Sequence, residues 1–312
     1  MASGALSARG TGTGAGRGGG RPSGPPGRSR ARAWLYLLPA LVVYVGFAIY
    51  SAAGTVWFSL LDWDGVRPPT WAGAANYVRV LTDPLLAEAI LNGLTLIVFF
   101  SFVPIAVGLL LTGLLLGRVR TGMTFFRTVF FLPQVLPLVA VGITWRWLYS
   151  DGGMVNRMLE SVGLGALTRA WLGDYHFALI ALGLIGTWCM SGLCMVLFMS
   201  GAQRIDPALN EAAAIDGAGP LRRFWYVTLP GLRREIGIAA VITTIAALAS
   251  FDLVFVTTNG GPAGQTNVPA LLVYRLAFNE GSIGGASALA VVLTLIVIVL
   301  VSAIRFLTRE DR

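Results

Sequence analysis

The sequence predicts an all-α integral membrane protein that crosses the membrane six times, with both termini in the cytoplasm. Three observations predict this fold class: the composition, a series of long apolar segments, and the positions of the arginines. Of the 312 residues, 55% are hydrophobic and only 12% are charged, and the mean hydropathy is +0.73. Soluble domains carry about 25% charged residues. The deficit indicates a chain whose surface largely faces lipid.

Six apolar segments are each long enough to cross a hydrocarbon core of about 30 Å. The first is longer than the apolar region of a typical secretion signal, so it is expected to remain as an uncleaved span. The third contains Pro133 and Pro137, which should kink it. The segments are residues 34–58, 90–116, 124–148, 177–200, 236–257 and 286–306.

The basic residues orient these spans. All 23 of them are arginine, and most fall on the cytoplasmic side if the N-terminus lies inside, as the positive-inside rule requires. The absence of lysine also rules out a GxxxxGK[ST] phosphate loop, so this chain cannot hold ATP in that way. The arginines left on the outer side are Arg67, Arg79, Arg146, Arg157, Arg169 and Arg275.

The expected organisation follows from these segments. Residues 1–32 are rich in Gly, Ser, Pro and Arg and should form a disordered cytoplasmic tail. Its arginines could contact RNA or anionic lipid, but a solvated tail that keeps the N-terminus inside is favoured. The first transmembrane helix lies within 33–60, an extracytoplasmic loop covers 61–89, and a core with the other five spans covers 90–308.

Cysteine and histidine are too sparse for redox or metal chemistry. Cys189 and Cys194 lie five residues apart in one apolar segment, so they would point in different directions on a helix and are expected to serve as small apolar packing residues. His176 is the one histidine, and a metal site needs more donors than that. No metal site is expected.

The connection over residues 201–235 is expected to be two short helices rather than a loose loop. Asp206 and Pro207 suit a helix start, and Gly217 suits a left-handed position at its end. Pro220 can open a second helix that ends near Pro230. The apolar side chains that this places on the surface need either a protein partner or the bilayer surface. They are Leu209, Ala212, Ala213, Phe224 and Trp225.

The same connection resembles the EAA signature of ABC importer permeases, which reads EAA-x3-G-x9-I-x-LP. Glu211-Ala212-Ala213, Gly217 and Leu229-Pro230 keep its spacing, and only Val227 departs from it. The stretches "IDGAGPLRRFWYVTLP", "FFLPQVLP", "GTW", "TNGGP" and "ANYVRVLTDP" are similar to the carbohydrate branch of that family, the permeases of maltose and glycerol-phosphate type. The resemblance covers residues 34–308.

This resemblance implies a type I importer permease fold in a multi-pass protein of a bacterial cell membrane. It implies a heterodimer with a second permease chain, two ATPase subunits that bind ATP and Mg²⁺, and an extracytoplasmic protein that delivers a sugar. The chain itself would be no enzyme, hold no cofactor and bind no nucleic acid. Glu211 would pair with a basic residue of an ATPase subunit, Ala212 and Ala213 would allow close approach, and Gly217 would supply the bend. Leu229-Pro230 would return the chain to the next span.

Candidates for the solute pathway come from chemistry and from the resemblance. Hydrogen-bonding and flat aromatic groups suit a sugar, and these include Gln134, Thr187, Trp188 and Thr244. For the threonines, packing between helices or a bond to their own helix is favoured. The resemblance implies pathway-lining positions for Gln134, Gly186, Met190, Thr243 and Ala247.

Asp252 is the most distinctive residue of the fifth apolar segment. A carboxylate inside a span should face water, a partner or the solute, because its insertion costs a few kcal/mol. The simpler reading is an interfacial carboxylate that reaches water. Phe251 beside it is a candidate for part of a gate.

Two other classes of protein fit the sequence less well. A stand-alone secondary transporter or channel would need intramembrane charge, and the chain offers little beyond Asp252. It would also leave the EAA segment unexplained. A membrane enzyme would need a motif such as HExxH or GxSxG, and the sequence contains neither.

Overall fold

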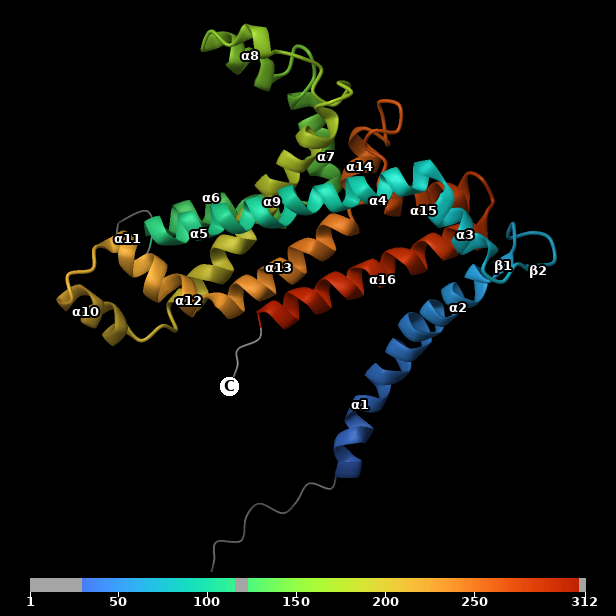
Figure 1. Ribbon diagram of the computed structural model, residues 1–312, viewed down its shortest axis with the longest axis horizontal. Helices are drawn as coiled ribbons and strands as arrows, with labels where there is room; N and C mark the ends of the chain where they lie inside the picture. Colours follow the sequence, from blue (N-terminus) through green and yellow to red (C-terminus); the bar gives the residue numbers. More distant parts are fainter. Residues whose placement is uncertain (1–29, 116–122, 309–312) are drawn as a thin grey trace, which may run out of the picture. The chain divides into compact units, whose positions relative to one another are not determined.

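The computed structural model describes residues 30–115 and 123–308, mostly as helices (Figure 1). Residues 1–29 of the expected tail, Arg118, Arg120 and the last four residues lie outside the described ranges. The chain divides into two units, Met1–Ser51 and Ala52–Arg312. In the first, α1 (Arg30–Tyr44) continues into a π-helical turn, Val45–Ile49.

Fifteen more α-helices and one hairpin follow in the described residues. The hairpin pairs β1 (Leu61–Asp62) with β2 (Thr70–Trp71) in antiparallel register. The helices are α2 (Tyr50–Ser59), α3 (Ala75–Thr82), α4 (Pro84–Ile97), α5 (Val103–Leu115), α6 (Met123–Val135), α7 (Leu138–Leu148), α8 (Met154–Ser161), α9 (Ala178–Ala202), α10 (Pro207–Ile215), α11 (Pro220–Arg223), α12 (Leu229–Gly231), α13 (Arg233–Leu248), α14 (Asp252–Thr257), α15 (Pro269–Phe278) and α16 (Ile283–Leu307).

Four helices in the described ranges are long and apolar enough to cross a membrane, and a bent pair would make a fifth. They confirm apolar helices over the first, second, fourth and sixth predicted segments. The second begins earlier than expected, because Asp83 caps α4 through the N–H of Leu85 and Pro84 occupies the first helical position. The four are Tyr36–Ser59, Pro84–Leu114, Ala178–Ala202 and Ile283–Leu307.

The third apolar segment is sharply bent, as its prolines predict. Its two helices, α6 and α7, meet at 100°. Pro133 lies inside α6, and the break falls at Leu136 and Pro137, just before α7. Since proline lacks an N–H and disfavours a helical residue before it, Pro137 is the residue that sets the break.

The fifth apolar segment is not one helix, and the prediction of a continuous span over 236–257 was wrong. α13 ends at Leu248, three residues follow, and α14 begins at Asp252. No proline or glycine causes this break. Phe251 instead lies against Phe255 and Tyr274, with ring centroids 5.1 and 5.3 Å away, so packing against α15 decides the local conformation.

α9 forms the centre of the helical unit. Within α9, 61% of the most apolar 18-residue stretch is buried inside this chain. The helix packs against α5, α6 and α13. Glycine permits the closest approaches, as is usual between membrane helices. A Cβ on Gly186 would lie 2.0 Å from the ring of Phe100, and one on Gly192 would lie 2.1 Å from the carbonyl oxygen of Phe130.

Within this unit, the two loop regions lie at opposite ends of the long helices. α10 and α11 lie at one end of α5, and α3 with the β-hairpin lies at the other end of the bundle (Figure 1). Asn76 anchors the hairpin end, because its amide donates to the carbonyl oxygens of Ser59 and Leu61 at 3.0 and 2.8 Å.

Candidate functional site

The connection between α9 and α13 is two short helical segments joined at a glycine, as the sequence predicts. Asp206 caps α10, with its side chain 2.9 Å from the N–H of Ala208, and Pro207 is the first helical residue. Gly217 follows the helix with φ +78°, the left-handed conformation that glycine adopts without strain. The N–H of Ala218 reaches back to the carbonyl oxygen of Ala213 at 2.9 Å, which completes the C-terminal cap.

The second segment runs from Pro220 to Gly231, close to the bounds that the sequence predicts. α11 continues through a π-helical turn, Phe224–Thr228, into α12. Phe224 is only half-exposed, because its ring packs against α5, where a Cβ on Gly113 would lie 3.0 Å from it. The expectation that Phe224 faces outward is therefore corrected, since Gly113 opens a space for it.

The base of the connection is fixed in the core. Leu232 follows α12 and is fully buried in a cluster with Phe198 and Cys194 of α9 and Ala239 of α13. Arg204 and Glu235 form an ion pair at 4.0 Å beside this cluster. The connection is thus attached to both α9 and α13.

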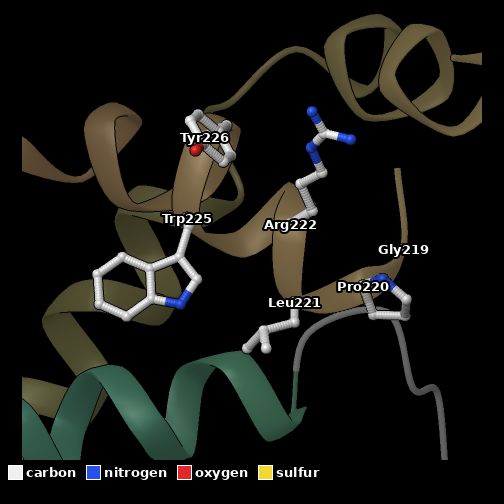
Figure 2. A pocket seen from close by; sticks show the side chains of 6 residues that line it. All are labelled: Gly219, Pro220, Leu221, Arg222, Trp225 and Tyr226. Carbon is white, nitrogen blue, oxygen red and sulfur yellow. The ribbon is translucent and has the colours of Figure 1, made fainter. Parts of the chain in front are cut away.

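The tip of the connection is exposed. Glu211 and Ala212 face solvent, Ala213 is half-exposed, and the carboxylate of Glu211 has no hydrogen-bond or ion-pair partner among the described residues. Leu229 is half-buried and Pro230 exposed. Six residues from α11 and its flanks line a shallow depression of about 660 Å³, with Leu221, Trp225 and Tyr226 as its apolar walls (Figure 2).

Large apolar side chains surround this tip. Ile215 is 87% exposed and Tyr226 is 76% exposed. Leu209 and Trp225, which the sequence predicts to be exposed, are exposed. A free carboxylate among such side chains suits a protein surface that buries the apolar groups and supplies a cation.

Four of the predicted pathway residues lie inside the helix packing of this chain. Gly186, Met190, Thr243 and Ala247 are all buried. Thr243 donates to Ser101 Oγ at 2.7 Å, which is contact between neighbouring helices. The expectation that the threonines pack between helices holds for Thr243 here.

Two other predicted residues, Gln134 and Trp188, are differently placed. Gln134 lies at the α6–α7 bend, and its Oε1 is buried without a partner among the described residues. Trp188 is exposed and meets Trp145 edge-on at 5.6 Å. Gln134 thus has a free amide oxygen, and Trp188 has an exposed ring.

Asp252 is exposed in the first turn of α14, beside the break. The sequence predicts that Asp252 lies inside one continuous helix, whereas in the structure it lies at the start of a separate one. Phe251 is half-exposed in the aromatic cluster with Phe255 and Tyr274.

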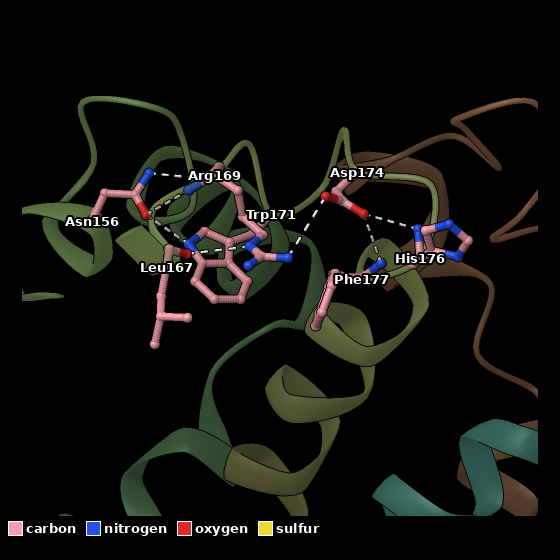
Figure 3. Close-up of polar contacts among 7 residues, drawn as sticks. All are labelled: Asn156, Leu167, Arg169, Trp171, Asp174, His176 and Phe177. Atoms are coloured by element: carbon pink, nitrogen blue, oxygen red, sulfur yellow. Dashed lines mark hydrogen bonds and ion pairs between the residues drawn. The ribbon is translucent and has the colours of Figure 1, made fainter. Parts of the chain in front are cut away.

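A polar network that the sequence analysis missed organises residues 149–177 (Figure 3). The buried amide of Asn156 donates to the carbonyl oxygens of Ser150, Asp151 and Arg169 and accepts from Trp171 Nε1 at 2.8 Å. The Arg169 guanidinium lies 4.1 Å from the centroid of the Phe177 ring. Single residues scattered over a connection give no periodic signal, so nothing in the sequence marks this network.

The cysteines behave as predicted. Cys189 and Cys194 are free and buried. Across residues 30–115 and 123–308, the structure brings together no cluster of His, Cys, Asp and Glu that could hold a metal ion.

Comparison with known proteins gives consistent matches. Residues 105–310 match the family model described as "binding-protein-dependent transport system inner membrane component". The chain is 33% identical to a probable ABC transporter permease of Bacillus subtilis over 86% of this chain and 92% of that one. It is 32% identical to a multiple sugar-binding transport system permease of Streptococcus mutans, covering 85% and 90% of the two chains.

The solved structures agree on the fold. A bacterial ABC transporter involved in the import of the acidic polysaccharide alginate superposes with a TM-score of 0.75. It is 22% identical, and the match covers 90% of this chain and 97% of that chain. At this identity, the likeness shows the arrangement of helices alone.

Proposed function

Because the chain belongs to the family of binding-protein-dependent transport system inner membrane components, we propose that it is the permease subunit of an ATP-driven sugar importer. It is accordingly a multi-pass protein of the cell membrane. The observation that carries the proposal is the exposed α10 with its unpaired Glu211, in a connection whose base is fixed in the core by the buried Leu232. The sugar class rests on relatives described as permeases for multiple sugars, lactose, and trehalose and maltose.

The proposed topology has six spans with both termini in the cytoplasm. The bent pair α6–α7 counts as the third span, and α13 with α14 as a broken fifth. Broken helices are tolerated at membrane depth where they face a cavity or other protein. The loop over 201–235 then lies in the cytoplasm, which fits its place at the opposite end from the β-hairpin (Figure 1).

In this proposal, α10 lies in a cleft of a separate ATPase subunit. Glu211 pairs with a basic residue there, and the small side chains of Ala212 and Ala213 let the helix approach closely. ATP and Mg²⁺ are bound by that subunit, so this chain is a mechanical partner in hydrolysis and not the catalyst.

Movement of α10 would be transmitted to α9 and α13 through Leu232, which is buried between them. The capped turn at Gly217 fixes α10 to α11, and α12 leads directly into Leu232 between α9 and α13. Because a packed core transmits displacement instead of absorbing it, a pull on α10 would tilt both spans and switch access from one face of the membrane to the other.

The solute pathway would be shared with a second permease chain, and an extracytoplasmic binding protein would deliver the sugar. Gln134, Trp188, Phe251 and Asp252 are the residues we propose to face the pathway. The buried set, Gly186, Met190, Thr243 and Ala247, would reach solute only after helices of this chain separate.

Uptake by the assembled transporter tests the coupling role. Glu211→Lys should abolish ATP-dependent uptake while the chain remains in the membrane at its normal level, because it reverses the charge that pairs with the ATPase. Glu160, in α8, is also exposed, so Glu160→Lys is the matched control and should transport normally. Normal uptake by the Glu211→Lys transporter would refute the assignment of α10.

Cross-linking tests the contact directly. The native cysteines are buried, so a cysteine introduced at Ala212 is the accessible thiol. Ala212→Cys should form a cross-link to an ATPase subunit in membranes, whereas Ser161→Cys in α8 should not. The chain reconstituted alone should show no sugar flux, and flux without companion proteins would favour a stand-alone transporter instead.

A further inference from the structure

A groove runs between α13 and α16 at the end of the bundle that carries the connection to α9. The two helices lie side by side here (Figure 1), and the cavity between them measures about 340 Å³. Arg234 and Arg305 line its mouth, and Ile238, Ile242 and Val301 line its length. It is separate from α10 and from the proposed pathway residues.

The mouth of the groove carries two unneutralised charges. Arg234 and Arg305 are exposed, and neither has a hydrogen bond or ion pair among the residues that the structure describes. The charged residues next to Arg234 in the sequence already have other partners. Arg233 donates to the carbonyl oxygen of Leu307 at 2.7 Å, and Glu235 pairs with Arg204. No described carboxylate therefore neutralises the mouth, so it is suited to an external anion.

Away from its mouth the groove is apolar, and it follows α13 and α16, which we propose as spans. Ile238 and Ile242 are exposed, and Val301 is half-buried. From Arg234 to Ile242, α13 rises about 12 Å, which is close to the depth of one bilayer leaflet. At the mouth the chain segments approach closely, since a Cβ on Gly237 would lie 2.7 Å from Thr308 Oγ1.

We propose that this groove binds one anionic phospholipid. Its phosphate headgroup lies between Arg234 and Arg305, and one acyl chain lies along Ile238, Ile242 and Val301. Arginine pairs well with phosphate oxygens, and basic pockets between spans near the membrane surface are known binding sites for anionic headgroups. A free phosphate would use the charges but leave the apolar length empty.

Native mass spectrometry of the purified full-length chain, titrated with phosphatidylglycerol, tests the proposal. The wild type should retain one phosphatidylglycerol more tightly than phosphatidylcholine. Arg234→Gln with Arg305→Gln should weaken this binding on the order of tenfold, since each arginine near the surface contributes measurably. Arg79→Gln with Arg146→Gln, which removes the same charge from two exposed sites elsewhere, should leave it within about twofold of the wild type.

A second variant keeps the charges and fills the groove. Val301→Phe should also weaken retention while leaving both arginines in place, which separates lipid binding from simple charge attraction. Equal retention by the wild type and the Arg234/Arg305 variant would overturn the proposal, as would equal loss in the Arg79/Arg146 control. Competition by soluble glycerol phosphate at the affinity of the lipid would identify a free-anion site and would likewise overturn it.

Discussion

The N–H of Ala218 donates to the carbonyl oxygen of Ala213 at 2.9 Å, so the chain closes the end of α10 before it turns. This bond requires Gly217 to adopt φ +78°, since the two residues can meet only across a left-handed turn. The direction of α10 relative to α11 is therefore set by a local cap and not by extensive packing.

Gly217→Ala should disturb this turn. A Cβ there meets nothing within 4 Å, so the cost is conformational strain of about 1 kcal/mol. Uptake by the assembled transporter should fall several-fold while membrane levels stay normal. Gly219→Ala is the matched control, because Gly219 also has open space but a φ of −66°. Equal uptake by the two variants would show that the turn does not orient α10.

Asn156→Ala should loosen residues 149–177. The substitution removes one side chain that serves three carbonyl oxygens and the Trp171 indole, and the orphaned groups should cost about 2 kcal/mol. Hydrogen exchange over this segment should accelerate, with α9 unaffected. Ser161→Ala, which loses only a local bond to Met158, should exchange like the wild type.

Gly192→Ala should prevent normal packing of α6 on α9. The new methyl group would lie 2.1 Å from the Phe130 carbonyl oxygen, and backbone cannot give way as a side chain can, so the loss should be about 3 kcal/mol. The yield of monodisperse protein and its thermal midpoint report this. Gly46→Ala, with nothing within 4 Å, should match the wild type; similar behaviour of both would contradict the close approach.

Acid should loosen the segment around Asp174. The N–H of His176, with that of Phe177 and the Arg169 guanidinium, lowers the pKa of Asp174 below its ordinary 3.8. The folded segment therefore favours the carboxylate, and this stabilisation is present above pH 3.8 and lost as pH falls through the lowered value. Trp171 fluorescence should report the transition. Asp174→Asn should abolish it, whereas Asp151→Asn should retain it.

The sequence predicts the long helices well and the interruptions only in part. Apolar length alone identifies 177–200 and 286–306, because an uninterrupted span must satisfy its own backbone. Pro137 predicts the bend of the third span. The break before Asp252 carries no such residue, because it depends on the contact between Phe251 and Tyr274, which joins separate parts of the chain.

The candidate site divides in the same way. The connection over 201–235 was predictable because Asp206, Gly217 and Pro220 act locally through caps and turns. The positions of Gly186 and Thr243 were not, since their burial depends on Phe100 and Ser101 of a different span. Whether a residue of one span faces a cavity or a neighbour is decided by packing, which hydropathy does not encode.

The burial of α9 within the unit also constrains how the protein is made. α5 and α6 are synthesised before α9, yet both pack against it, and the rings of Phe99 and Phe100 face its glycines. A nascent chain that has emerged only as far as residue 170 thus lacks the helix around which its earlier spans assemble. Translation must proceed through α9 before those spans find their native neighbours, so early truncations should be cleared by membrane proteases instead of accumulating as partial folds.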